Sequence, residues 1–383
     1  MSHSAPLEVT DVDHPAPGSV AIVHDYLNQP GGAERVVLAM SGIWPDAPIY
    51  TSLYRADSTF PGFGAADVRT SGLHWLPVDS AFRNLFPLYP AAFRSFGPLE
   101  YDVVISSSSG WAHSVRTSER TFHAVYCHAP ARWLYGDEHL VDARQRALRP
   151  FVSAMRQWDR GAARRAHLYV ANSEEIRRRI HAQYGVDAPV VYPPVDVDRF
   201  VARERGERLL VVSRLLPYKR VDAIVDAATR SGIGLDIVGT GPALADLRRR
   251  AGPTVKFYGR LPDDDVRELM QSCRALCVTG REDFGITAVE ANAAGKPVVA
   301  FRSGGALETL EEGVTGAFFL SHEPEAVLGA IRRCDQIETP PAAIAAAARR
   351  FSRHAFESSF RNAVEEGWRA HRERVHRGGR IPV

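Results

Sequence analysis

The chain of 383 residues is long enough for two or three domains, because a single hydrophobic core rarely grows past roughly 250–300 residues. Its composition, with 45% hydrophobic and 24% charged residues and a net charge of +2, is ordinary for a globular protein, and no run approaches the roughly 18 apolar residues that span a membrane. Residues 1–18 lack the basic and apolar regions of a signal peptide, so we expect a loose leader and a cytoplasmic protein.

The four cysteines indicate neither a disulfide framework nor a metal site. Cys127, Cys273, Cys277 and Cys334 show no paired CxxC motif and no zinc-ligand spacing. Cys273 and Cys277 fall in an apolar run, so we expect reduced cysteines that are buried in a core.

The first half of the chain alternates apolar runs with helical patterns. Residues 19–24 are typical of a buried strand, and Gly31 and Gly32 follow and open a helix with apolar residues at helical spacing. This succession is the usual opening of a nucleotide- or sugar-binding α/β domain, although the full GxGxxG pattern is missing. Further predicted elements are strands at 49–53, 102–106, 121–127, 168–171 and 190–191 and a helix at 174–183.

Two arginine-rich segments in this half have more than one interpretation. Residues 82–94 combine aromatic residues, arginines and prolines, which suits contact with a membrane surface or a lipid substrate. Packing of a loop and helix against the domain is the favoured alternative. The basic run 144–165 is typical of a solvated helix face.

A domain boundary is predicted at about 195–206, where Pro193 and Pro194 interrupt the pattern and a charged segment follows. Beyond it, strands alternate with helices, which predicts parallel sheets and hence an α/β protein with two facing Rossmann-like domains and a cleft between them. The predicted elements are strands at 209–212, 235–238, 255–258, 275–278, 298–301 and 316–320, and helices at 221–230 and 263–272. The expected domains are 19–196 and 197–355, followed at 356–383 by a helix that crosses back to the first domain and a basic tail.

Candidate ligand-binding residues lie where predicted strands end, which is where parallel sheets bind ligands. Arg214 and Lys219 follow the first strand of the second half. They form a plausible diphosphate site, because arginine can contact two oxygens at once and lysine adds a compact charge. A salt-bridged surface pair is the alternative, but Lys219 gains weight as one of only three lysines in the chain.

One short segment holds two carboxylates and a glycine turn. Glu282 and Glu290 flank the sequence Phe284-Gly285-Ile286. A helix that begins near Phe284 would direct its free N–H groups and positive dipole towards a ligand that Glu282 also faces, which suits a molecule with hydroxyls and phosphates. Glutamates and glycine turns are common in α/β proteins, so this segment alone is equally compatible with ordinary structure.

Together these segments resemble the retaining glycosyltransferases of family 4, which have the GT-B fold. The resemblance rests on PGGAER (30–35), SRLLPYKRVD (213–222), the Glu282-x7-Glu290 pattern and GGALET (304–309), and covers nearly the whole chain from Ser19 to about Phe360. A further likeness is to bacterial mannosyltransferases of polysaccharide and O-antigen assembly. It rests on LFPLYPAAF (85–93), YDVVISSSS (101–109), VYCHAPARWLY (125–135) and VYPPVD (191–196).

The resemblance implies a role for each matching residue. Arg214 and Lys219 would hold the donor diphosphate, Glu282 would contact the transferred sugar, and His128 would lie near the reacting carbon or a sugar hydroxyl. These four are the implied catalytic residues. Further donor-binding positions are Gly31, Gly32, Gly239, the amides of Phe284, Gly285 and Ile286, and Glu290, which would bind ribose. The implied acceptor contacts are Asp25, Glu34 and Arg132.

The implied reaction is transfer with retention at the anomeric carbon, through a transition state with oxocarbenium character. No DxD motif stands in a suitable place, because residues 196–198 lie in the linker and residues 263–265 cap a helix. We therefore expect no metal and no cofactor beyond the nucleotide-sugar donor. No carboxylate is identified as a nucleophile, so a front-face route is the preferred hypothesis.

The implied partners are a nucleotide-sugar, with GDP-mannose as the preferred donor, and a saccharide or polyprenyl-linked acceptor in cell-surface polysaccharide or glycolipid assembly. Peripheral contact with the inner membrane face is possible, and no nucleic acid is expected. Relatives often have threonine at the position of Ala129, which leaves the acceptor or sugar preference open.

Four alternatives stay open. A family 4 enzyme could use a UDP-sugar, either UDP-glucose or UDP-N-acetylglucosamine. A nucleotide-sugar epimerase is disfavoured by the two spaced glutamates together with Arg214 and Lys219. A sugar dehydrogenase needs an intact GxGxxG, of which only Gly239 and Gly241 are present. A sugar-nucleotide-binding regulator without catalysis is disfavoured because every charged position that the chemistry needs is present.

Overall fold

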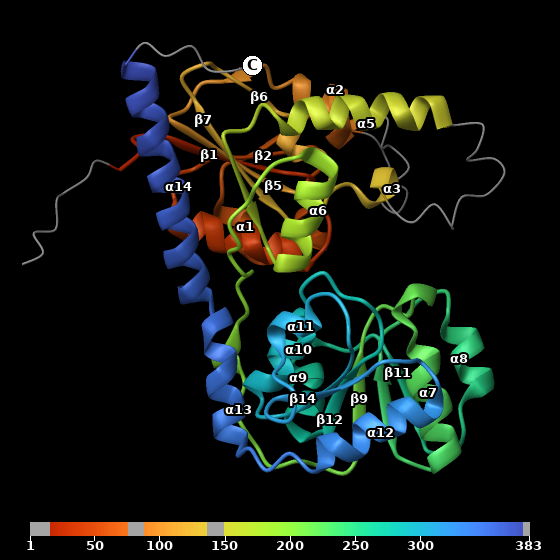
Figure 1. Ribbon diagram of the computed structural model, residues 1–383. Helices are drawn as coiled ribbons and strands as arrows, with labels where there is room; N and C mark the ends of the chain where they lie inside the picture. The colour runs from red at the N-terminus through yellow and green to blue at the C-terminus, as the bar shows by residue number, and fades with distance from the viewer. Residues whose placement is uncertain (1–15, 76–87, 136–148, 378–383) are drawn as a thin grey trace, which may run out of the picture.

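The computed structural model describes residues 16–75, 88–135 and 149–377. Two α/β domains, one above the other in Figure 1, are each built on a six-stranded sheet. Neighbouring strands are parallel in both sheets, so the predicted pair of Rossmann-like domains is confirmed. The inner strands are buried along their whole length because helices cover both faces of the sheets.

The first sheet has the strand order β3-β2-β1-β5-β7-β8. Its strands are β1 (Val20–His24), β2 (Ile49–Thr51), β3 (Val68–Thr70), β5 (Val103–Ser108), β7 (Phe122–Cys127) and β8 (Leu168–Ala171). Its helices are α1 (Gly32–Ile43), α2 (Tyr89–Arg94), α3 (Arg132–Tyr135), α5 (Arg149–Ala163) and α6 (Glu174–Tyr184). A separate pair of two-residue strands is formed by β4 (Pro98–Leu99) and β6 (Arg116–Thr117).

The second sheet repeats this plan in the order β11-β10-β9-β12-β13-β14. Its strands are β9 (Leu209–Val212), β10 (Leu235–Val238), β11 (Val255–Gly259), β12 (Ala275–Val278), β13 (Val298–Phe301) and β14 (Gly316–Phe319). Its helices are α7 (Val221–Ser231), α8 (Leu244–Arg250), α9 (Asp263–Ser272), α10 (Ile286–Ala293), α11 (Ala306–Thr309), α12 (Pro324–Asp335) and α13 (Pro341–Ala348). In both sheets the first strand lies in the middle, and such a reversal of strand order opens a crevice at the carboxyl ends of the strands.

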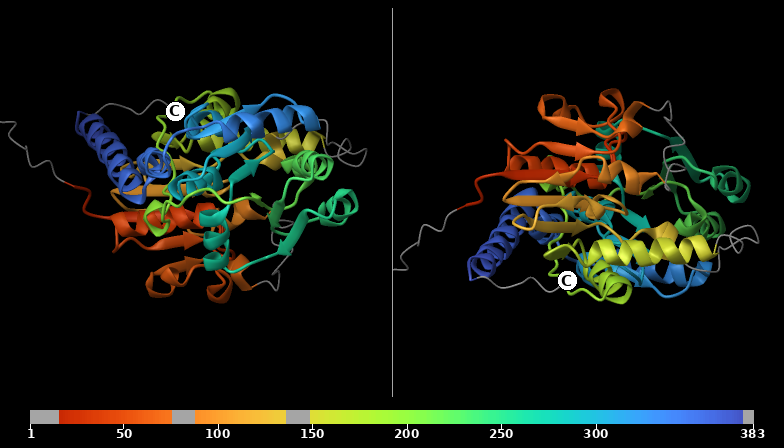
Figure 2. Two further views of the ribbon diagram at one scale, coloured as in Figure 1. Left: turned by 90° about the horizontal axis from the view of Figure 1, so that it is seen from below. Right: turned by 90° about the horizontal axis from the view of Figure 1, so that it is seen from above.

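The last helix, α14 (Arg353–His376), returns to the first domain and runs along one side of the molecule in Figures 1 and 2. Phe356, Phe360, Val364 and Trp368 belong to the hydrophobic core beneath α1 and β1. These side chains recur every four residues, so they form one apolar face of the helix. The C-terminal helix therefore completes the core of the N-terminal domain.

The chain crosses between the domains twice, and the two crossings lie side by side. The Val195 N–H donates to the Phe351 carbonyl over 2.9 Å. The ring of Phe284, from the segment before α10, lies 5.4 Å from that of Phe351 and 5.7 Å from that of Tyr192. The turn that carries the predicted carboxylates is therefore packed against the connection between the domains.

Three local expectations differ from the structure. The strand predicted at 190–191 is reduced to an isolated bridge between Val190 and Ala171. Helix α10 begins at Ile286 rather than near Phe284, because Gly285 has a left-handed φ of 92° and Phe284 is buried instead. Strand β3 is absent from the prediction because it has only three residues, none of them buried.

The two arginine-rich segments lie partly outside the described residues. Within 82–94, residues 82–87 are not described, while α2 buries Tyr89 and Phe93 against the first domain. Within 144–165, residues 144–148 are not described. The described arginines Arg156 and Arg160 donate to the carbonyls of Leu134 and Gln183 over 2.7 and 2.9 Å.

Candidate functional site

The glycine turn of the first domain faces the start of α10 in the second. Gly31 caps α1 and Gly32 is its first residue. A Cβ atom at Gly32 would lie 2.9 Å from Cδ1 of Ile286, so the two domains touch here and a side chain at position 32 would have to displace that of Ile286. The carboxyl ends of the two sheets therefore face each other between the domains, where sheets of this strand order bind ligands, and this region is called the cleft below.

Lys219 and Glu282 meet at the carboxyl ends of β9 and β12. The Lys219 Nζ lies 2.6 Å from both carboxylate oxygens of Glu282, and the two side chains are only 13% and 24% exposed. The neighbouring strands bring these residues together, because β9 pairs with β12 in the sheet. The predicted phosphate-binding cation and the predicted sugar-binding carboxylate thus form one ion pair.

Arg214 leaves the same strand end and is exposed, without an ion pair to any residue that the structure describes. Gly239 explains how this loop is held. It has a φ of 136°, and a Cβ atom there would overlap the Ser213 carbonyl oxygen. Glycine is thus required at 239 by the close approach of two backbones, and its contact with a donor stays a prediction.

Glu290 is reached from across the cleft by Arg35 of α1. The Arg35 Nη1 lies 3.3 Å from Glu290 Oε1, and its Nη2 lies 3.5 Å from Asp263. Burial raises the pKa of Glu290, and the charge of Arg35 opposes that shift. A single arginine of the first domain therefore bridges two carboxylates of the second, and the predicted ribose contact of Glu290 stays untested.

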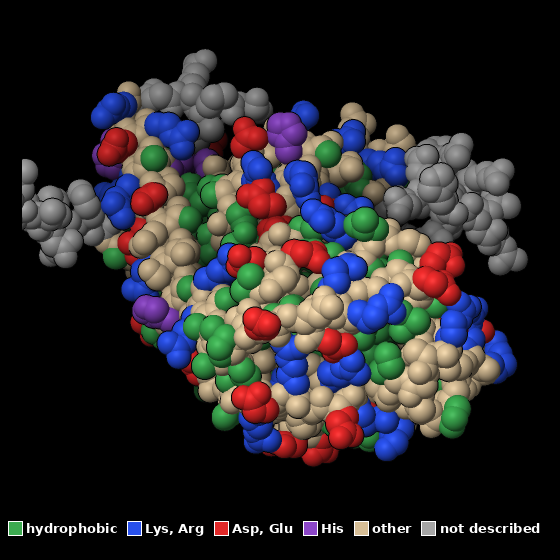
Figure 3. Space-filling model, turned by 60° about the horizontal axis from the view of Figure 1, so that its bottom comes forward, with side chains coloured by type: hydrophobic (Ala, Val, Ile, Leu, Met, Phe, Trp, Pro, Cys, Tyr) green, Lys and Arg blue, Asp and Glu red, His purple; other side chains and the backbone are tan. Residues whose placement is uncertain are grey.

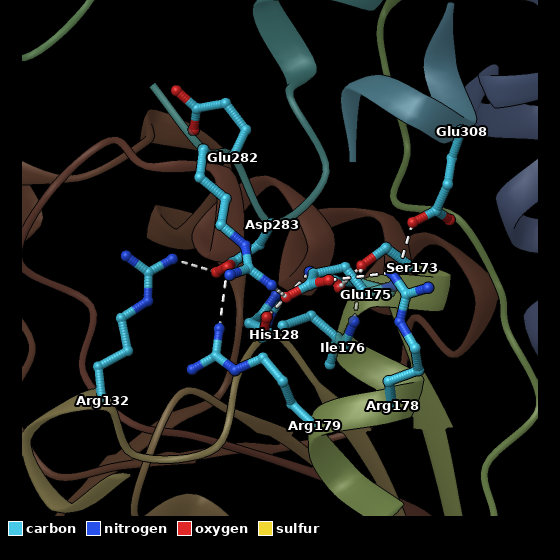
Figure 4. A network of polar contacts seen from close by, with 12 residues as sticks. His128, Arg132, Ser173, Glu175, Ile176, Arg178, Arg179, Glu282, Asp283 and Glu308 are labelled. Carbon is cyan, nitrogen blue, oxygen red and sulfur yellow. Dashed lines mark hydrogen bonds and ion pairs between the residues drawn. The ribbon is translucent and has the colours of Figure 1, made fainter. Parts of the chain in front are cut away.

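Asp283, next to Glu282, is the centre of a second set of interdomain contacts (Figure 4). It forms an ion pair with Arg132, and its other carboxylate oxygen lies 3.0 Å from Arg179 of α6. Arg281 pairs in the same way with Glu175. The segment 281–283 thus carries charges that hold the two domains against each other.

Glu308 of α11 adds a contact of a different kind to this interface. Its carboxylate accepts the backbone N–H groups of Glu174 over 2.7 Å and of Glu175 over 3.1 Å. These are the first N–H groups of α6, so a carboxylate of the second domain caps a helix of the first.

His128 directly follows β7 and is half-buried at the cleft side of the first domain. Its backbone is fixed by hydrogen bonds to the Ser108 carbonyl over 2.9 Å and from Asn172 over 3.1 Å. Burial, with a smaller contribution from the nearby His24, lowers the pKa of His128 to about 3. The imidazole is therefore neutral at physiological pH.

The three residues assigned to the acceptor have different surroundings. Asp25 is buried, and its carboxylate accepts the N–H groups of Trp111 over 2.9 Å and of Ala112 over 2.8 Å. Glu34 is also buried and accepts a hydrogen bond from Gln29. Arg132 is exposed and reaches Asp283. Asp25 and Glu34 are thus occupied within the first domain, and acceptor binding by all three stays a prediction.

Several site residues were not identified from the sequence. Asp283 stands beside Glu282 in the recognised segment, so a second carboxylate at this strand end is the signal in the sequence that could have identified it. Arg35 stands in the recognised PGGAER segment, but nothing local links it to Glu290, 255 residues away. Arg179 lies in an ordinary arginine-rich helix and carries no distinguishing signal.

The described part of the chain contains no group of three or more histidine, cysteine, aspartate or glutamate side chains arranged to hold a metal ion. The four cysteines are buried and unpaired. Among the described helices, none is long and apolar enough to cross a membrane. On the face shown in Figure 3, basic and acidic side chains are interspersed.

Comparisons with known proteins identify the family. The family model for "Glycosyltransferase Family 4" matches residues 30–199, and that for "Glycosyl transferases group 1" matches residues 196–351. Together they cover both domains and the cleft between them. The fold and the two family models define a GT-B glycosyltransferase. The chain belongs to glycosyltransferase family 4.

Curated relatives match the chain over different lengths. A D-inositol 3-phosphate glycosyltransferase of Acidothermus cellulolyticus is 28% identical over 86% of this chain and 80% of that protein. A second, from Geodermatophilus obscurus, is 28% identical over 61% of this chain and 59% of that protein. A GDP-mannose-dependent alpha-(1-6)-phosphatidylinositol monomannoside mannosyltransferase of Mycolicibacterium smegmatis is 33% identical over 42% of this chain and 50% of that protein. The matches therefore span from half to four-fifths of these relatives.

Solved structures show the same fold. The crystal structure of Anabaena Alr3699/HepE in complex with UDP has a TM-score of 0.68 at 19% identity and covers 91% of this chain and 100% of that one. That of AviGT4, a glycosyltransferase involved in avilamycin A biosynthesis, has a TM-score of 0.56 at 18% identity and covers 92% and 97%.

Proposed function

We propose that this protein transfers mannose from GDP-mannose, with retention at the anomeric carbon, to a saccharide or polyprenyl-linked acceptor in cell-surface polysaccharide or glycolipid assembly. The observation that carries the proposal is the pairing of Lys219 with Glu282 at the carboxyl ends of β9 and β12, in a cleft that His128 faces from the other domain. The sequence likeness to bacterial mannosyltransferases and the GDP-mannose dependence of the relative from Mycolicibacterium smegmatis favour mannose and GDP.

Each charged group has a distinct task in this proposal. Arg214 and Lys219 neutralise the departing diphosphate, and the N–H groups at the start of α10 add positive potential from the same side. Glu282 orients the sugar through its hydroxyls while paired with Lys219. Glu290 accepts hydrogen bonds from ribose, and its contact with Arg35 closes the first domain over the nucleotide.

The proposed reaction is a front-face substitution. The bond between the anomeric carbon and the phosphate oxygen breaks, and the acceptor oxygen bonds to the same face of that carbon. The acceptor proton passes to the departing phosphate oxygen, so no protein base is needed. Lys219 and Arg214 lower the energy of this step because negative charge grows on the diphosphate as the bond breaks.

The test is a donor screen with an extracted lipid-linked saccharide acceptor. GDP-mannose, UDP-glucose and UDP-N-acetylglucosamine are supplied separately and nucleotide release is followed, with Lys219→Ala protein as background. We expect acceptor-dependent release of GDP alone, and an α-linked product by NMR. Turnover with a UDP-sugar only would overturn the mannosyl assignment, and a β-linked product would overturn retention.

Peripheral contact with the inner membrane face is also part of the proposal. In the described part of the aromatic segment, Leu88 and Arg94 are exposed while Tyr89 and Phe93 pack inwards. Co-sedimentation with anionic vesicles should fall when Leu88 and Arg94 are both replaced by serine. Equal sedimentation of that variant would remove this segment from the proposal.

A further inference from the structure

A chain of buried polar side chains leads from His128 to helix α1. The Ser107 Oγ lies 2.8 Å from Nε2 of His128 and 3.1 Å from Nδ1 of His24. The Nε2 of His24 in turn lies 4.0 Å from Oε1 of Glu34. Ser107, His24 and Glu34 are at most 1% exposed. The chain exists because β1 and β5 are neighbours and their register places His24 opposite Ser107.

The surroundings of His24 favour a proton on its Nδ1. Burial alone would lower the pKa of His24, but the nearby carboxylates of Glu34 and Asp25 and the Ser107 carbonyl together raise it above the ordinary 6.5. Nδ1 also lies 3.1 Å from the Ser107 carbonyl oxygen, which can only accept. Nδ1 of His24 therefore carries a proton.

The direction of the remaining hydrogen bonds follows from that proton. With His24 donating from Nδ1, the Ser107 hydroxyl acts as an acceptor on that side. Its own hydrogen is then directed at Nε2 of His128, which must accept it. The proton of a neutral His128 is left on Nδ1, and no described residue accepts a hydrogen bond from that atom.

We infer that His24 and Ser107 are positioning residues, which lock His128 in the tautomer with its proton on Nδ1 and so present an N–H donor, rather than a base, to the ligand in the cleft. The ligand role of His128 rests on the proposed function. A neutral donor suits a sugar that gains positive charge, because it can bind a hydroxyl oxygen without adding a full positive charge beside the ring.

The glycine turn has a place in this arrangement. A Cβ atom at Gly31 would overlap Oε2 of Glu34, an oxygen that is buried and lacks a hydrogen bond within the described chain. Glycine at 31 thus leaves room for the carboxylate that stabilises His24. The PGGAER segment therefore acts on His128 through Glu34, His24 and Ser107 as well as by bringing the domains together.

The test measures the tautomer directly, by NMR of protein with 15N-labelled histidine and without any donor. His128→Gln assigns the His128 signals among the 14 histidines. We expect a neutral His128 protonated on Nδ1 in the wild type, and a mixture of tautomers in Ser107→Ala. Protonation on Nε2 in the wild type would overturn the inference, whatever the donor screen shows.

A matched control stands next to Ser107 on β5. Ser106 is equally buried, and its Oγ lies 2.8 Å from Nε2 of His123, a histidine outside the cleft. Ser106→Ala should leave the His128 tautomer unchanged. With the donor that the screen identifies, Ser107→Ala should lower kcat about tenfold with little change in the donor KM, and Ser107→Thr should restore most of the loss. Equal tautomer populations in the two alanine variants would also overturn the inference.

Discussion

Replacing Lys219 by alanine should remove catalysis while leaving the fold nearly intact. Its Nζ lies 2.6 Å from both oxygens of Glu282, but the pair is partly exposed at 13% and 24%, so its loss should cost only about 1 kcal/mol of unfolding free energy. That corresponds to a fall in Tm of about 2–4 °C for a domain of this size. Losing a cation that faces charge developed in the transition state costs about 3–4 kcal/mol, or about 10²–10³ in kcat.

The assay compares thermal unfolding with nucleotide release at saturating donor. Lys256→Ala is the control, because Lys256 is an exposed lysine on β11, away from the cleft. It should match the wild type in both measurements. A Lys219→Ala protein with wild-type kcat would refute the phosphate role of Lys219. A variant that unfolds far below the wild type would instead show that the Lys219–Glu282 pair is mainly structural.

Three further predictions concern the cleft, the first domain and pH. Gly32→Val should raise the donor KM about tenfold, because the valine side chain would meet Ile286 across the cleft. Gly64→Ala is the control and should leave the donor KM unchanged, because no atom lies near the Cβ position of Gly64. Equal donor KM values in the two variants would show that the cleft does not close at Gly32. Asp25→Asn should lower the unfolding free energy by about 1.5–3 kcal/mol, because the Asp25 carboxylate accepts hydrogen bonds from the Trp111 and Ala112 N–H groups. Urea denaturation measures this change, and an unchanged midpoint would contradict the prediction. Burial lowers the pKa values of His123, His128 and His167 to about 3, 3 and 4. As pH falls, these histidines therefore bind protons in the unfolded chain at a higher pH than in the folded protein. The free energy of unfolding should thus fall between about pH 6.5 and pH 3. His123→Gln should flatten that loss in urea titrations and His376→Gln, at an exposed site, should not.

The regular elements could be predicted because their signals are local. Helix α9 spans residues 263–272 as expected, since three aspartates in its first turn precede a helical pattern. The strands appear as apolar runs because parallel strands are buried on both faces. The sequence predicts a start of α10 near Phe284, about two residues too early, because only the fold shows that Phe284 packs on Phe351 and that Gly285 caps the helix.

The partners within the site could not be predicted, because they depend on strand order and on the approach of the two domains. Lys219 meets Glu282 only because β12 lies next to β9, although two other strands come between them in the chain. Arg35 meets Glu290 only when the domains face each other. Ser107 stands in the recognised YDVVISSSS segment, but nothing local links it to His24 or His128. The register of β1 on β5 places His24 opposite Ser107, and the pairing of β5 with β7 brings Ser107 to His128.

The arrangement of charges favours different roles for the two cations of the proposed donor site, Lys219 and Arg214. Lys219 is already neutralised by Glu282, so an incoming diphosphate must share it with that carboxylate. Arg214 is exposed and has no ion pair with a described residue, so it contributes positive charge that the site does not cancel. Arg214 is therefore suited to attract the donor. Lys219 is fixed by two contacts to Glu282. It is therefore suited to bind the departing phosphate oxygen in a fixed position relative to the sugar that Glu282 orients.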